Sequence, residues 1–185
     1  MAQKVTFETY KGKAEYPWLN IPDTQFDPEG KFKTGLRVPA DQCKELRDKI
    51  RQFAQDEFGK KAENARVPYK TDPDTGEIIL NAKSNYQPKV YDSKGQIIVP
   101  SNIPQIWGGS VLKMGGTLHA YNSGGNIGVS LQLTKIQVID LAERQDDGGG
   151  FAPEEGSFVA AEHNNESNSN GSQEDKKEDG FSADF

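Results

Sequence analysis

Alternating apolar and polar residues dominate most of this chain and predict a mainly β fold. The clearest run covers 110–121 and 126–141, two segments joined by a glycine-rich turn, where apolar residues recur at every second position. The alternation slips by one place near Thr134 and Lys135, so we expect a β-bulge there. The pair Gly115-Gly116 interrupts the first segment and predicts a sharp bend of the kind that small closed barrels need.

Shorter strands are expected upstream, separated by turns that contain Asp, Pro and Gly. The expected strands cover 4–19, broken at Pro17, and then 31–38, 77–84, 88–91 and 96–99.

One segment has a helical period instead. From Asp41 to Phe58, apolar residues recur at steps of three and four, which places them on one face of a helix that starts at Asp41 and ends at Gly59. The residues of this face are Cys43, Leu46, Ile50, Phe53, Ala54 and Phe58.

The composition changes after position 145. Residues 164–180 contain no apolar side chain, so this stretch is unable to bury a core, and we expect 146–185 to form a disordered acidic tail behind a folded domain at 1–145. The last residues nevertheless place two phenylalanines beside carboxylates, which is typical of a docking motif for a partner protein. The residues of this motif are Asp179, Phe181, Asp184 and Phe185.

The formal net charge of −6 conceals a segregation of the two signs. Residues 1–145 hold 20 Lys and Arg against 17 Asp and Glu, a net charge of +3, whereas 146–185 hold 2 against 11, a net charge of −9. A mildly cationic body suits a polyanion, and an acidic tail suits either a basic partner or the body itself.

Several chemistries find no support in the sequence. Cys43, His119 and His163 are the only cysteine and histidines, which leaves too few ligands for a zinc site, and we expect Cys43 to be a buried structural thiol. Phosphate-binding glycine loops and hydrolase motifs are absent, so we expect no enzymatic activity, no metal and no cofactor. The chain has no signal-peptide pattern and no apolar run long enough to span a membrane, which predicts a soluble intracellular protein.

Lysines lie close to aromatic residues at several points of the predicted strands. Lysine neutralises phosphates and an aromatic ring stacks on an unpaired base, so this interleaving suits single-stranded DNA. The predicted binding residues are Tyr16, Trp18, Lys31, Lys33, Lys83, Tyr86, Lys89, Tyr91, Trp107, Lys113 and Tyr121.

A place in the core is the alternative for each aromatic residue taken singly. We expect Phe7, Phe26, Phe53 and Phe58 in the core, and the two tryptophans lean the same way. For Tyr86, Tyr91 and Tyr121, a place in the core or at its rim and a role in base stacking are equally balanced alternatives.

A series of short motifs, in order along nearly the whole chain, resembles the single-stranded-DNA-binding proteins of tailed-phage replication. The motifs are Tyr16-Pro17-Trp18, the Pro39-Ala40-Asp41 helix entry with Cys43, Val90 to Gly95, Ile106 to Ser110, Ala120-Tyr121-Asn122, Val129 to Leu133, Val138 to Leu141, and the acidic tail with Phe185.

The resemblance implies a five-stranded OB-fold barrel with one α-helix, no catalysis, and often a dimer. It maps DNA-binding roles onto Lys31 or Lys33, Lys83 and Tyr121. It also implies that the tail occupies the DNA groove when DNA is absent and contacts the phage DNA polymerase and primase-helicase. We therefore expect a protein that coats single-stranded DNA during phage replication and recombination, in the cytoplasm of the infected bacterial host. The alternative is a protein-interaction adaptor that does not bind DNA.

Overall fold

The computed structural model describes residues 4–143, so the predicted tail and its docking motif (Asp179, Phe181, Asp184, Phe185) lie outside the described residues. In chain order, the elements are β1 (Thr6–Glu8), β2 (Gly12–Asp23), β3 (Lys31–Val38), α1 (Lys44–Phe58), the 3₁₀ helix η1 (Gly59–Asn64), β4 (Tyr69–Thr71), β5 (Ile78–Ser84), β6 (Lys89–Tyr91), β7 (Ile97–Ile98), the 3₁₀ helix η2 (Pro100–Asn102), β8 (Val111–Ser123) and β9 (Asn126–Asp140).

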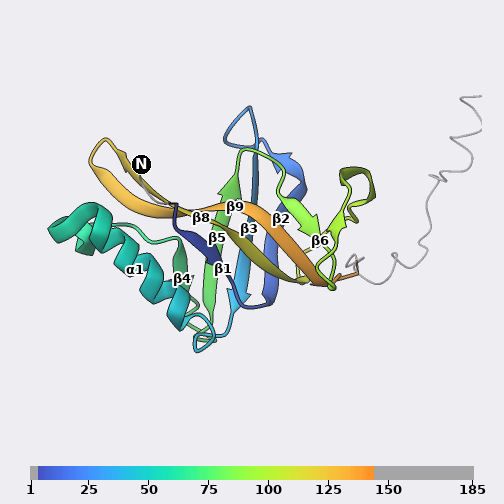
Figure 1. Cartoon of the computed structure of the whole chain (residues 1–185), viewed down its shortest axis with the longest axis horizontal. Coiled ribbons are helices and arrows are strands. Elements are labelled where there is room, and N and C mark those ends of the chain that lie inside the picture. The colour runs from blue at the N-terminus through green and yellow to red at the C-terminus, as the bar shows by residue number, and fades with distance from the viewer. Residues whose placement is uncertain (1–3, 144–185) are drawn as a thin grey trace, which may run out of the picture. The chain divides into compact units, whose positions relative to one another are not determined.

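The strands form one sheet that closes in a ring. Strands β8, β2, β3, β5 and β9 pair in this order, and β9 pairs back onto β8 along its whole length. Four short strands extend the ring at its edges: β1 pairs with β8, β4 with β5, β6 with β9, and β7 with β6 (Figure 1). The predicted mainly β fold with five principal strands and one α-helix is confirmed.

The β8–β9 hairpin contains the predicted bulge. Gly115 pairs with Lys135 and Gly116 pairs with Leu133, so Thr134 is the extra residue that has no partner across the ladder. A Cβ atom at Gly116 would overlap the backbone of β9, which explains why glycine is needed where the two strands approach so closely.

Strand β2 does not end at its proline, and that prediction was wrong. The strand continues to Asp23, with a shift in its pairing with β3 between Glu15 and Trp18. Tyr16 has a φ of 46°, in the left-handed region that non-glycine residues seldom adopt, and Pro17 has no N–H to donate. A bulge absorbs the proline inside a longer strand.

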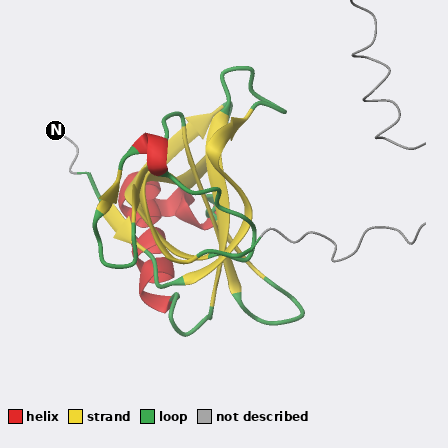
Figure 2. Cartoon of the chain, turned by 90° about the vertical axis from the view of Figure 1, so that its right-hand side faces the viewer, coloured by secondary structure: helices red, strands yellow, loops and turns green. Residues whose placement is uncertain are grey.

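Helix α1 packs against β8 and β9 and buries the predicted face. Figure 2 shows the helix on one side of the sheet. It begins three residues later than expected: Cys43 is the residue before its first turn, and the side chain of Asp41 does not cap it. Gly59, with a φ of 56°, ends the helix as predicted. Cys43 is buried, and this burial raises the pKa of its thiol, as expected of a structural cysteine.

The core fills the ring and the space under α1. Phe7 belongs to it as predicted, and Phe53 and Phe58 are partly buried against it. The core prediction for Phe26 was wrong, because this residue lies in the β2–β3 connection and its side chain is 85% exposed. No helix within residues 4–143 combines the length and apolarity needed to cross a membrane.

Candidate nucleic-acid interface

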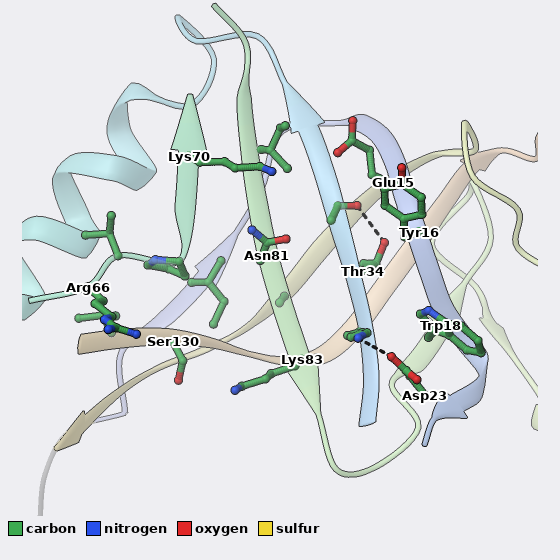
Figure 3. A pocket seen from close by; sticks show the side chains of 18 of the residues that line it. Glu15, Tyr16, Trp18, Asp23, Thr34, Arg66, Lys70, Asn81, Lys83 and Ser130 are labelled. Atoms are coloured by element: carbon green, nitrogen blue, oxygen red, sulfur yellow. Dashed lines mark hydrogen bonds and ion pairs between the residues drawn. The ribbon is translucent and has the colours of Figure 1, made fainter. Parts of the chain in front are cut away.

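A groove of about 780 Å³ runs across the outer face of the ring. Its floor is formed by β3, β5 and the first half of β9. The bulge of β2 forms one wall and the segment 66–70 forms the other, so that Tyr16 and Trp18 face Arg66 and Lys70 across the floor (Figure 3).

Strand register aligns an aromatic ring and two lysines across the groove. Trp18 is paired with Lys33 on β3, and Lys33 is paired with Lys83 on β5. Directly paired residues have their side chains on the same face of the sheet, and neighbouring strands are about 4.8 Å apart. The row therefore places a stacking surface beside two cations within about 10 Å.

The two lysines of this row differ in their electrostatic partners. Lys33 forms an ion pair with Asp23, a buried carboxylate, and its ammonium lies 6.0 Å from the ring centroid of Phe26. The side-chain hydrogen bond from Lys33, together with the backbone N–H of Gln25, holds the pKa of Asp23 below its usual range. Asp23 is thus a carboxylate at neutral pH and compensates the charge of Lys33.

Lys83 has no such partner. Its side chain is exposed, as are those of Arg66 and Lys70, and none of the three forms an ion pair or a side-chain hydrogen bond with any residue of 4–143. These three groups are the uncompensated cations of the groove.

Arg37, also on β3, is neutralised by its own surroundings. Its guanidinium bonds to Glu15 at 2.5 Å, to Asp72 at 2.5 Å and to Glu77 at 3.3 Å. These hydrogen bonds raise the pKa of Arg37 and hold that of Asp72 below its usual range. Because Glu15 is engaged in this cluster, it does not compensate Arg66, Lys70 or Lys83.

Backbone hydrogen bonds fix the wall that carries Arg66. Its N–H donates to the carbonyl of Ile127 and its carbonyl accepts from Val129, so the segment lies beside β9. Tyr121 pairs with Gly128 and covers it closely: a Cβ atom at Gly128 would lie 2.9 Å from the Arg66 carbonyl and would overlap the Tyr121 hydroxyl. Gly128 therefore allows the Tyr121 ring to lie against this wall.

The structure brings five of the predicted binding residues to the groove, namely Tyr16, Trp18, Lys33, Lys83 and Tyr121. Tyr16 and Trp18 are 86% and 42% exposed, and Trp107 is 39% exposed, so the expectation that the two tryptophans lean to the core was wrong.

The other six predicted residues do not line the groove. Lys31 is engaged by Asp27 and Asn85 at the start of β3. Tyr91 and Lys113 line a separate hollow with Glu8 and Lys135, which form an ion pair of 2.5 Å. Tyr86, Lys89 and Trp107 are exposed outside the groove, and Trp107 lies in a small depression that Trp18 also lines.

Sequence reasoning missed Arg66 and Lys70, although Tyr69 lies between them, because β4 is only three residues long and no strand was expected there. It also placed Phe26 in the core rather than beside Lys33. Among residues 4–143, no group of three or more His, Cys, Asp or Glu side chains is placed to hold a metal ion.

No protein-family model and no curated protein sequence matches the chain. Solved structures do. The single-stranded DNA-binding protein gp2.5 of bacteriophage T7 is 25% identical, with a TM-score of 0.67, and the match covers 85% of this chain and 99% of that one. The single-stranded DNA-binding protein of bacteriophage Enc34, in a structure with single-stranded DNA, is 17% identical with a TM-score of 0.62, over 75% of this chain and 88% of that one.

At 17% identity the likeness to the Enc34 protein concerns the fold alone, whereas the T7 protein is matched over nearly its whole length. The resemblance carried by the sequence motifs is thereby confirmed: this chain has the fold of the bacteriophage single-stranded DNA-binding proteins.

Proposed function

We propose that the chain is a non-catalytic protein that binds single-stranded DNA along the groove of β2, β3, β5 and β9, largely independently of sequence. The observation that carries this proposal is the row Trp18, Lys33 and Lys83 across three neighbouring strands. The structural neighbours support it, since they are single-stranded DNA-binding proteins of two phages, one of them in a complex with single-stranded DNA.

Each part of the groove has a counterpart in an unpaired strand. Lys83, Arg66 and Lys70 neutralise phosphates and release counterions, and Trp18 and Tyr16 offer rings on which bases stack. Every base has a π-face, so stacking tolerates all four bases. Double-stranded DNA hides these faces inside its stack, which makes the groove selective for unpaired strands.

The biological role follows from this mode of binding. A protein that holds unpaired strands without sequence preference coats and protects them during phage replication and recombination, in the cytoplasm of the infected bacterium. The adaptor alternative has no comparable support, because nothing in the groove calls for a partner protein, whereas the Trp18 ring aligned with the uncompensated Lys83 suits DNA.

We assign the acidic segment 146–185 to regulation. With a net charge of −9, it imitates a phosphate chain and competes with DNA for the cations of the groove. When DNA displaces it, Phe181 and Phe185 become available to the phage DNA polymerase and primase-helicase.

Deleting 146–185 tests the competition. The shortened protein should bind oligo(dT) more tightly than the full chain, with the largest gain at low salt, because the competition is electrostatic. Equal or weaker binding by the shortened protein would refute it.

Filter binding of labelled oligo(dT) in dilute buffer tests the main proposal. The protein should retain the oligonucleotide, and a Lys83→Gln variant should retain less, whereas Lys94→Gln, a control in the exposed β6–β7 turn, should match the parent protein. Failure of the parent protein to retain DNA at low salt would favour the adaptor.

A further inference from the structure

A second hollow adjoins the groove and shares Arg66 with it. This hollow, of about 720 Å³, lies between the end of α1, the 3₁₀ helix η1 and the tip of the β8–β9 hairpin. We call it the η1 hollow. Its lining residues include Phe58, Lys60, Lys61, Asn64, Asn126 and Ile127, in addition to Arg66.

The charge of the η1 hollow suits a polyanion. Lys60 and Lys61 are exposed, and neither forms an ion pair with any residue of 4–143. Glu57 is the single carboxylate among the lining residues, against Lys60, Lys61 and Arg66. The lining therefore holds a net surplus of two positive charges, together with three asparagine amides.

The shape of the η1 hollow is also suitable. Phe58 and Ile127, both half-buried, give it an apolar patch. The hairpin tip has Gly124 and Gly125 with φ values of 57° and 89°, and a Cβ atom at either would meet nothing within 4 Å. The tip thus leaves open space beside the hollow.

Arg66 connects the two hollows in a fixed position. Its backbone is held by hydrogen bonds of 3.0 and 2.8 Å to Ile127 and Val129 on β9, while its side chain is exposed and without a partner in the described part of the chain. A phosphate bound by Arg66 at the end of the groove would leave the next phosphate of the same strand within reach of the η1 hollow.

From this geometry we infer that the η1 hollow is an extension of the DNA-binding track, in which Lys60 and Lys61 bind the phosphates that follow the nucleotides in the groove. The inference rests on the proposed function of the groove. It gives a DNA-binding role to the two lysines of η1. The strand pattern does not predict this role, because η1 is a 3₁₀ turn outside the sheet.

The test compares the full chain with a Lys60→Gln/Lys61→Gln variant, using a long oligo(dT) at several salt concentrations. Each phosphate contact contributes about 0.7 to the slope of log K against log salt for single strands. Loss of two contacts should flatten the slope by about 1.4, so the fall in affinity between about 50 and 200 mM salt should be about 7-fold smaller. Lys44→Gln/Lys49→Gln, which removes two exposed charges from α1, is the matched control and should keep the parent slope.

The outcomes separate the two proposals. If the parent protein does not bind DNA, the proposed function fails. If it binds, and the η1 variant keeps the slope of the control, the extension is wrong while the groove stands. Tighter DNA binding by the η1 variant would also overturn the inference, because it would mean that the two lysines bind the acidic tail rather than DNA. Thermal unfolding midpoints equal to that of the parent protein establish that the variants are folded. Lys60→Gln alone should flatten the slope by about half as much as the double variant.

Discussion

Replacing Asp23 with asparagine should make the protein bind single-stranded DNA more tightly and with a steeper dependence on salt. Asp23 is buried at the edge of the groove, pairs with Lys33, and has a pKa held below its usual range by that lysine. It is therefore ionised at neutral pH and opposes the approach of phosphates. Asparagine has nearly the same shape and still accepts the backbone N–H of Gln25, so the change removes charge and little else.

The magnitude follows from one additional uncompensated cation. Freeing Lys33 adds one phosphate contact, which steepens the slope of log K against log salt by about 0.7. The fall in affinity between about 50 and 200 mM salt should then be about 2.6-fold larger than in the parent protein. The assay is an oligo(dT) titration at four or more salt concentrations, with thermal unfolding to show that the variant is folded.

Glu29→Gln is the control for the Asp23 variant. It changes the net charge by the same amount at an exposed position of the β2–β3 turn that does not line the groove. The reasoning is refuted if Asp23→Asn has the same slope as Glu29→Gln, or if it binds DNA less tightly than the parent protein.

Three further predictions concern stacking, packing and pH. Trp18→Ala should weaken binding by about 1–3 kcal/mol, or about 5- to 150-fold, whereas Trp107→Ala, at a similarly exposed ring outside the groove, should change it little; equal losses would contradict this assignment. Gly116→Ala should destabilise the fold by about 1–3 kcal/mol or more, because its Cβ would overlap the β9 backbone, while Gly108→Ala, with no atom closer than 3.9 Å, should keep the parent denaturant midpoint. Arg37 lowers the pKa of Asp72 on the β4–β5 turn, so their pairing stabilises the fold above the unfolded-state pKa of 3.8, and this stabilisation is lost as the pH falls through the lower folded-state pKa. Arg37→Gln should therefore flatten the dependence of the unfolding midpoint on pH below about 4. An unchanged acid profile would contradict the assignment.

Much of the fold could be predicted from local pattern. The alternation in β8 and β9, the phase slip at Thr134 and the helical face of α1 each report on burial within a few residues, and the structure confirms all three. The prediction of a strand break at Pro17 was wrong, because the free-energy cost of a proline in a strand depends on how the partner strand pairs with it. Here β3 tolerates a shift in register, and the bulge that results places Tyr16 on the groove.

The site was less predictable, because sequence proximity of a lysine and a ring does not fix which face or which strand they share. Trp18 and Lys83 are 65 positions apart and come together only through the register of β3. Arg66 lies outside the expected strands, and it reaches the groove because backbone hydrogen bonds attach its segment to β9. By contrast, Tyr91 and Lys113 satisfied the local pattern but line a different hollow.

A titration of a Trp107→Phe variant with oligo(dT) tests the central claim most directly, because Trp18 is then the only tryptophan and lies in the groove. If the groove binds DNA, the fluorescence of Trp18 should be quenched on binding, and log K should fall with log salt with a slope of about −2 or steeper, from the phosphate contacts of Lys83, Arg66 and Lys70. Binding that leaves Trp18 unquenched and is insensitive to salt, or no binding in dilute buffer, would contradict the account.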